Sequence, residues 1–357
     1  MKPRAALLLL IVGVLALAGG WYFGVRSTPA ARERSAAGEL AFPGLAPRLQ
    51  QAARLEIVHA GKTLTIERHG DVWGVADRFD YPVQPGKLHA VLSGLTELRL
   101  TERRTTDSGE FSRLGVEDAQ APTASSTLLR VLDAQGQAIA ALIVGHQRIR
   151  GGTNLPPQIY VRRPGEDQAW LAEGTLQVDA DPQLWFDRDL VNIEQSRIAE
   201  VAITRGEQHL QLTSQGGKLA VTAPDGLPKL DENKLDDVGH GLEFLSFTDV
   251  KPAAQIPGEP LGHSVFTTTD GLVLTVDVNQ AGKDIWVHFT ASGKDAAKAQ
   301  ADQLTARLAA WCYQVGDYKR AALVPSLDDL KAAPPVVTPI PGAPGTPAPS
   351  PAPAPAQ

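Results

Sequence analysis

The chain has 357 residues, enough for two ordinary domains, and its 43% hydrophobic and 21% charged content is typical of a globular protein. A formal net charge of −6 argues against a general nucleic-acid binder, which normally carries a basic face. The single cysteine, Cys312, excludes an intramolecular disulfide bond and decides nothing about the cellular compartment.

The N-terminus carries an apolar segment that predicts a membrane anchor over residues 1–27. Residues 5–25 contain no charged side chain and follow Lys2 and Arg4. As a helix this segment would span roughly 31 Å, about the thickness of the bilayer hydrocarbon. The alternative is a signal peptide cleaved after Ala18, because residues 16–18 form a small-x-small site. In both cases we expect export. A retained anchor makes a single-pass inner-membrane protein with its C-terminal bulk in the periplasm.

Three small residues within this segment recur at four-residue spacing: Ala16, Gly20 and Gly24. Small side chains at this spacing let two membrane helices approach closely, so this stripe is a candidate contact with another membrane subunit. The alternative is that glycine and alanine are simply common in membrane helices.

The most informative pattern is an internal repeat. Residues 55–75 (LEIVHAGKTLTIERHGDVWGV) align without a gap on residues 201–221 (VAITRGEQHLQLTSQGGKLAV), 146 positions apart. Apolar residues alternate with polar ones in both, and glycines fall in the turns, which predicts three short antiparallel strands in each copy.

A helix is expected after each set of strands. Apolar residues recur at three- and four-residue intervals in both copies, now 147 positions apart: Leu88, Val91, Leu95 and Leu98, and Leu235, Val238, Leu242 and Leu245. Leu100 and Phe247 each begin a further extended segment.

Further strands are predicted in the second half of each copy. Hairpins are expected around Gln135-Gly136 and Asp270-Gly271. The first copy adds strands at 159–161 and 170–171, and the second adds a strand at 285–289 and a helix from about Lys294 to Trp311.

These patterns predict an α+β fold of two tandem related modules, each an antiparallel sheet packed with one or two helices, after the transmembrane helix. The modules cover residues 50–190 and 196–330, with the break near residues 189–196. Residues 333–357 are rich in proline and alanine, which predicts a disordered tail.

A search for reactive groups predicts no catalytic residue, cofactor or metal site. The eight histidines include no pair at helical ligand spacing, and there is no GxSxG motif. Cys312, at the end of the expected last helix, is interpreted as a core residue.

Neither the glycine pairs (151–152 and 216–217) nor Gly239-His240-Gly241 completes a phosphate-binding loop. Asp187-Arg188-Asp189 is expected to form an exposed ion pair between the modules. Acid–base chemistry by its two carboxylates is the alternative.

The order of motifs resembles that of a bacterial envelope family, domain-of-unknown-function family 4340. The resemblance covers roughly residues 50–330 and rests on these segments: Trp73, Arg113-Leu114-Gly115-Val116, Val144-Gly145, Ile159-Tyr160-Val161-Arg162, Trp185-Phe186-Asp187-Arg188-Asp189-Leu190 and Trp311-Cys312-Tyr313-Gln314-Val315-Gly316-Asp317-Tyr318-Lys319. It implies a periplasmic protein on one N-terminal span that assists ABC-type export or gliding-motility-like systems. It implies no catalytic residue.

Three functions follow as hypotheses. The first is a non-enzymatic accessory or scaffold protein of an inner-membrane ABC-type transport complex, with a permease or auxiliary subunit as partner. The second is an envelope module that binds a glycan, lipid or peptide in a groove between the two copies. Tryptophans are the expected lining: Trp73, Trp170, Trp185 and Trp286. The third is a hydrolase using Asp187 or Asp189.

Overall fold

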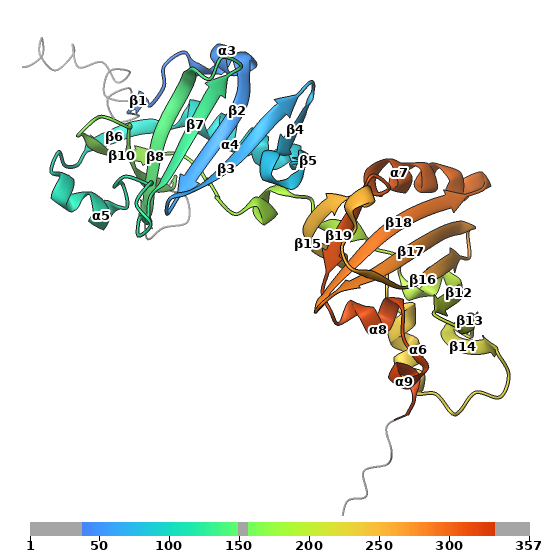
Figure 1. Cartoon of the computed structure of the whole chain (residues 1–357). Coiled ribbons are helices and arrows are strands. Elements are labelled where there is room, and N and C mark those ends of the chain that lie inside the picture. Colours follow the sequence, from blue (N-terminus) through green and yellow to red (C-terminus); the bar gives the residue numbers. More distant parts are fainter. Residues whose placement is uncertain (1–37, 149–155, 333–357) are drawn as a thin grey trace, which may run out of the picture.

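The computed structural model describes residues 38–148 and 156–332, which form two antiparallel sheets and a few helices (Figure 1). The first sheet contains β1 (Glu39–Leu40), β2 (Ala52–His59), β3 (Lys62–His69), β4 (Val72–Val75), β5 (Tyr81–Pro82), β6 (Arg99–Arg103), β7 (Thr127–Asp133), β8 (Ala138–Arg148), β9 (Gln158–Arg162) and β10 (Ala169–Glu173). The second contains β11 (Asp189–Val191), β12 (Ile198–Arg205), β13 (Gln208–Gln215), β14 (Lys218–Ala223), β15 (Leu245–Pro252), β16 (Glu259–Thr268), β17 (Leu272–Ala281), β18 (Asp284–Gly293) and β19 (Trp311–Val315). The predicted α+β class with two antiparallel modules is confirmed.

Seven α-helices accompany these sheets within the described residues. They are α3 (Leu45–Arg48), α4 (Pro85–Glu97), α5 (Phe111–Leu114), α6 (Glu232–Gly239), α7 (Lys298–Leu308), α8 (Lys319–Leu323) and α9 (Leu327–Leu330). We call the first sheet with α3 to α5 the first module, and the second sheet with α6 to α9 the second module. In Figure 1 the two modules are separate lobes joined at one end, and α7 lies across the strands of the second sheet.

The nine strands of the second sheet follow the same order as nine strands of the first sheet, which has one more strand, β5, at its edge. The first runs β1-β6-β10-β9-β8-β7-β2-β3-β4-β5, and the second runs β11-β15-β19-β18-β17-β16-β12-β13-β14. Equivalent strands start at residues 52 and 198, 62 and 208, and 72 and 218, so each pair is 146 positions apart. Helices α4 and α6 start at residues 85 and 232, 147 apart. This agreement supports the internal repeat predicted from the sequence.

The strand register repeats as well. Ile57 lies opposite Leu64 in the first module, and Ile203 lies opposite Leu210 in the second. All four side chains are buried, because alternate residues of a strand point to the same face and that face carries the apolar residues.

The helix of the second module is shorter than the sequence predicts. Helix α6 ends at Gly239, and Leu245 begins β15 instead of continuing the helix. In the turn between them, Phe244 has a positive φ angle (46°), and the Lys319 ammonium group donates to the carbonyl oxygens of Gly241 (3.2 Å) and Glu243 (3.0 Å). Leu245 is still buried, so its helical spacing reflected core packing rather than helix continuation.

The last predicted helix is wrong at its end. Helix α7 covers Lys298–Leu308 and follows directly on a 3-10 turn (Asp295–Ala297), so the predicted start near Lys294 is close to the observed one. Trp311, the predicted last residue, instead begins strand β19, which pairs with β15 and β18. Cys312 therefore lies in a central strand and not at a helix end.

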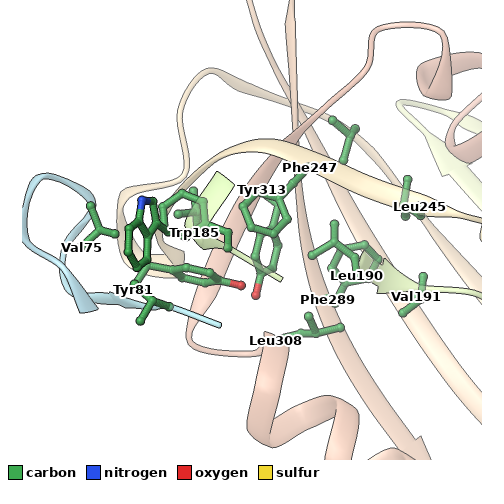
Figure 2. Close-up of a cluster of buried hydrophobic side chains, with 14 of the residues drawn as sticks. Val75, Tyr81, Trp185, Leu190, Val191, Leu245, Phe247, Phe289, Leu308 and Tyr313 are labelled. Atoms are coloured by element: carbon green, nitrogen blue, oxygen red, sulfur yellow. The ribbon is translucent and has the colours of Figure 1, made fainter. Parts of the chain in front are cut away.

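The buried side chains of both modules form one continuous core. Tyr81 of β5 joins them, because its ring contacts Phe186, Phe247 and Trp311 at centroid distances of 5.1, 5.6 and 5.0 Å. Figure 2 shows Tyr81 entering this cluster from the first module and facing Tyr313 of the second. Arg78 and Asp249 form an ion pair (2.9 Å) across the same junction.

The predicted anchor and tail lie outside the described residues, as do Ala16, Gly20, Gly24 and the 151–152 glycine pair. Within residues 38–148 and 156–332, no helix has the length and apolar character needed to cross a bilayer.

Candidate functional site

A cavity of about 530 Å³ lies where the two modules meet, and we call it the inter-module cavity. The first module supplies residues of β4, β5 and the start of α4: Asp71, Val72, Trp73, Tyr81, Pro82, Val83, Gln84, Pro85 and Leu88. The connecting segment (residues 174–188) and β11 supply Asp187, Asp189 and Leu190. The second module supplies Ala306, Arg307, Leu308 and Trp311. Neither module alone encloses this space.

The floor of the cavity is apolar. Tyr81, Leu88, Leu190 and Leu308 are buried, and the indole rings of Trp73 and Trp311 are partly exposed in its walls. An apolar floor flanked by partly exposed aromatic rings is the usual lining of a ligand-binding cleft.

Helix α4 holds the connecting segment in place at the edge of this cavity. The Gln84 backbone N–H donates to the carbonyl of Trp185, and the Gln84 side-chain amide donates to the carbonyl of Phe186, both at 2.7 Å. Gln84 is the residue before the first turn of α4, so its backbone N–H is available to the neighbouring segment. Lys87 adds an ion pair with Asp179.

The mouth of the cavity is charged. Asp71, Asp187 and Asp189 are exposed there and face one cation, Arg307. The Arg307 guanidinium donates to the carbonyl of Leu190, which ties α7 to β11. Three carboxylates against one guanidinium make the mouth acidic, which favours neutral or cationic groups over anionic ones.

Two buried phenol groups lie beneath the cavity. Burial raises the pKa of the Tyr81 hydroxyl, although its hydrogen bond with Tyr313 and the charge of Arg307 act in the opposite direction. Burial likewise raises the pKa of the Tyr313 hydroxyl, and the nearby Tyr81 raises it further. The Tyr313 hydroxyl oxygen also lies 3.4 Å from the carbonyl oxygen of Arg307. Both phenols therefore stay neutral at physiological pH and act as hydrogen-bonding groups.

The sequence singled out four tryptophans for a groove, and the structure places one of them there. Trp73 lines the cavity. Trp185 is fully buried behind it, with its indole N–H donating to the carbonyl of Asp179 (2.9 Å). Trp170 lies beside Arg103 in the first module, and Trp286 lies beside Lys251 in the second.

Trp311 and Arg307 were missed by the sequence analysis. Trp311 reaches the cavity because its ring packs on Tyr81 of β5, more than 200 residues earlier in the chain (5.0 Å between centroids), and Arg307 lies in α7, the helix before β19. Residues 311–319 carry part of the family resemblance, but no local spacing of residues indicates that Trp311 or Arg307 lines a cavity.

The Asp187-Arg188-Asp189 cluster differs from the expected ion pair. Arg188 donates to the carbonyl of Phe247 (3.0 Å), and among the described residues no ion pair joins it to either flanking carboxylate. Both carboxylates instead line the mouth of the cavity.

The remaining candidates have structural surroundings. Cys312 is buried between strands, its thiol near the carbonyls of Lys251 and Pro252, and burial raises its pKa to about 11. Gly216 and Gly217 form the β13–β14 turn, as expected, with positive φ angles. Within the part of the chain that the structure describes, no three His, Cys, Asp or Glu side chains are grouped to hold a metal ion.

Comparison with known proteins identifies the family. The model of the Domain of unknown function (DUF4340) matches residues 73–260, just over half of the chain. This match begins at Trp73 in the wall of the cavity and continues through the connecting segment into β16. A search of curated proteins finds no match. The chain belongs to the DUF4340 family.

Proposed function

We propose that this protein is a non-enzymatic, membrane-anchored accessory protein of the periplasm that holds a peptide segment in the inter-module cavity. The observation that carries the proposal is the cavity itself, an apolar space of about 530 Å³ between two modules with aromatic walls and an acidic mouth. Of the ligand classes expected from the sequence, a peptide fits this lining best.

The apolar floor favours a buried side chain such as leucine or phenylalanine. Burying one large apolar side chain contributes about 1.5–3 kcal/mol to the free energy of binding. Contacts of the bound peptide backbone add to this. Trp73 and Trp311 offer flat surfaces to the rest of the segment.

The acidic mouth selects the charge of the ligand. Asp71, Asp187 and Asp189 attract a lysine or arginine side chain and repel a phosphate or carboxylate. A cation placed over the exposed face of either tryptophan gains a further attraction. An anionic lipid head group meets three like charges at the same place, which makes a lipid the poorer candidate.

The setting of this function follows from the N-terminal segment and the family resemblance. An anchor over residues 1–27 would hold both modules at the periplasmic face of the inner membrane, beside an ABC-type permease or auxiliary subunit. The bound peptide is then a segment of a membrane partner or of exported cargo.

The proposal is tested by peptide binding to the full-length chain in lipid nanodiscs, because detergent would compete for an apolar cavity. Pentapeptides with one leucine and one lysine are compared with the same peptides carrying glutamate in place of lysine, with tryptophan fluorescence as the readout. We expect saturable quenching by the lysine peptides and at least about tenfold weaker binding of the glutamate peptides, since like charges disfavour association.

Substitutions locate the binding. Trp73→Leu and Trp311→Leu should each weaken binding, whereas Trp170→Phe is the matched control because Trp170 lies away from the cavity. Asp187→Asn with Asp189→Asn should reduce the preference for lysine peptides. Equal binding of both peptide sets, or binding unaffected by Trp73→Leu, would contradict the proposal. Cleavage of the bound peptide by the wild type and not by the double Asp variant would favour a hydrolase instead.

A further inference from the structure

The second module has a groove at the position equivalent to the inter-module cavity, and we call it the open groove. It has a volume of about 550 Å³ and lies between β14, the following loop and α6. Its walls include Lys218, Leu219, Leu227, Pro228 and Leu235, which occupy the repeat positions of Val72, Trp73, Tyr81, Pro82 and Leu88 in the inter-module cavity.

The first module has its cavity covered by the chain that follows. Asp187, Asp189 and Leu190 line it within five residues after Trp185. Trp185 ends a short helical turn (Pro182–Trp185), and its carbonyl accepts the backbone N–H of Gln84 at the start of α4.

The same docking occurs at the end of the second module. Leu330 ends α9, and its carbonyl accepts the backbone N–H of Asp231 (2.9 Å), the residue before α6. Asp231 is the repeat equivalent of Gln84, so Leu330 occupies the position equivalent to Trp185. The side chains of Leu330 and Trp185 are both buried. Lys331, which follows Leu330, bridges to a wall residue of the open groove, and Asp187, two residues after Trp185, lines the inter-module cavity.

The last described residues of the chain lie beside the open groove. Lys331 forms an isolated antiparallel bridge with Leu230, and Leu230 is itself a wall of the open groove. The described residues end one position later, at Ala332. Residues 333–340 read APPVVTPI, and after position 332 the large apolar residues are confined to this stretch: Val336, Val337 and Ile340.

The outer edge of β14 supplies a second reason for a partner. In the first module the equivalent strand β4 is covered by β5, with Gly74 opposite Pro82 and Val75 opposite Tyr81. Among the described residues, β14 is the last strand of its sheet. The groove beside this edge has a mixed lining, in which Leu219, Leu227 and Leu235 lie among polar and charged side chains such as Lys218 and Glu232. An edge strand with unpaired backbone groups beside such a groove accepts an extended segment.

We propose that residues 333–340 bind in the open groove, as residues 187–190 line the inter-module cavity, and extend along the free edge of β14, where the first module has β5. The apolar side chains of Val336, Val337 and Ile340 then contact Leu219 and Leu235 at the groove wall. Four residues of extended chain reach about 13 Å, which brings Val336 into the groove from Ala332. The proline-rich remainder of the tail continues beyond it.

Hydrogen–deuterium exchange of the full-length chain in nanodiscs tests this. The variant carries Val336→Asp, Val337→Asp and Ile340→Asp, and its matched control carries Ala348→Asp, Ala352→Asp and Ala354→Asp, which add the same charge farther along the tail. In the first variant we expect backbone exchange over residues 218–223 to rise about tenfold, and in the control we expect no change.

Two further measurements keep the test decisive. A chain ending at Ala332 should show the same rise over residues 218–223, with exchange over β4 unchanged as evidence that the modules stay folded. Adding a synthetic peptide of residues 333–342 to that chain should restore protection. Unchanged exchange in the first variant would overturn the proposal. So would protection that disappears on tenfold dilution of the wild type, because that would show a second copy in the groove.

Discussion

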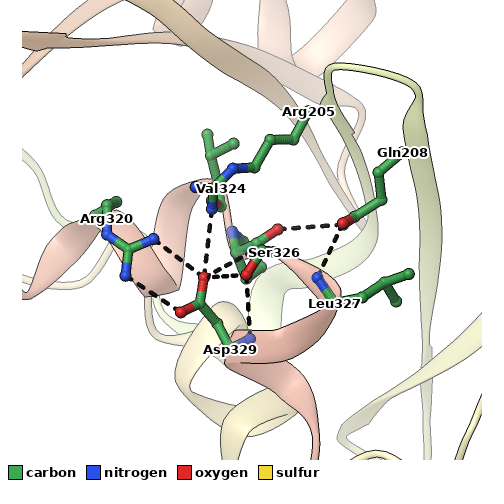
Figure 3. A network of polar contacts seen from close by, with 8 residues as sticks. Arg205, Gln208, Arg320, Val324, Ser326, Leu327 and Asp329 are labelled. Atoms are coloured by element: carbon green, nitrogen blue, oxygen red, sulfur yellow. Dashed lines mark hydrogen bonds and ion pairs between the residues drawn. The ribbon is translucent and has the colours of Figure 1, made fainter.

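Asp329 links α9 to the rest of the second module through a single carboxylate. It forms ion pairs with Arg205 (3.3 Å) and Arg320 (3.1 Å), and it accepts from the backbone N–H (2.8 Å) and hydroxyl (2.7 Å) of Ser326 (Figure 3). Partial burial raises the pKa of this carboxyl, but the hydrogen bonds from Arg320 and Ser326 outweigh burial and hold the pKa well below its usual value.

Replacing Asp329 with Asn should lower the free energy of unfolding at pH 7 by about 1–3 kcal/mol, because the ion pairs with Arg205 and Arg320 and the charge-assisted hydrogen bonds from Ser326 lose the carboxylate charge. A carboxyl with a lowered folded-state pKa stabilises the fold above its unfolded pKa of about 3.9, and loses this effect as the pH falls toward the folded value. The difference between wild type and variant should therefore be smaller at pH 3 than at pH 7 in urea unfolding.

Asp328→Asn is the matched control for this substitution. The Asp328 side chain is 85% exposed and pairs only with Lys331 at the surface, so its loss should have a small effect. Equal destabilisation by both variants, or a gap that stays constant with pH, would show that the Asp329 network does not stabilise the fold as its geometry indicates.

Part of this network has a local signal in the sequence. Ser326 and Asp329 stand three positions apart at the start of α9 and form a capping box. The two arginines carry no such signal, because Arg205 is more than 100 residues away and meets Asp329 only through the fold.

Helix α4 packs closely on the segment after β10 through a glycine. An added Cβ at Gly94 would lie 2.2 Å from the carbonyl oxygen of Thr175, closer than any side chain tolerates. Gly86, in the first turn of the same helix, has no neighbouring atom within 4 Å of that position. The two glycines therefore differ in packing while sharing a helix.

Alanine at these two positions should have opposite effects. Gly86→Ala should raise the free energy of unfolding by about 0.5 kcal/mol, because alanine loses less backbone entropy in a helix. Gly94→Ala should lower it by about 1–3 kcal/mol, because the helix must move away from Thr175. Urea unfolding of both variants measures the two changes. A stabilising Gly94→Ala would mean that α4 does not pack as closely as described.

Elements with a local signal were predicted well. The six strands of the repeat follow from alternating apolar residues over segments of four to eight residues, and their starts agree at the 146-residue offset. Helix ends were predicted less well, because Leu245 and Trp311 continue a helical spacing while belonging to strands. The spacing of apolar residues shows which positions are buried. A turn can bury residues at the same spacing as a helix, so the spacing does not show where the helix ends.

The two modules share one core, and Tyr81 is the residue that joins it. Its ring makes edge-to-face contacts with Phe186, Phe247 and Trp311 of the connecting segment and second module. A continuous core of this kind predicts that both modules unfold together, since neither can lose its structure without exposing the shared aromatic cluster.

Tyr81→Ala should separate the modules. Removing a buried aromatic ring costs about 3–5 kcal/mol, and here the loss falls on the junction. Hydrogen exchange at β3 and β13 during urea titration should give one midpoint in the wild type and two in the variant. Tyr81→Phe, which retains the ring and loses only the hydroxyl, should keep one midpoint. Two midpoints in the wild type would contradict a shared core.

The sequence by itself determined the class of fold, the repeat and its offset, because these depend on local alternation of apolar and polar residues and on self-similarity along the chain. Its predicted anchor over residues 1–27 remains a prediction outside the described residues. Only the tertiary structure decided where the two copies meet and which side chains line the space between them. Trp73, Asp187 and Trp311 come from distant segments of the chain and line one cavity. Their proximity results from long-range packing, which no local sequence pattern indicates.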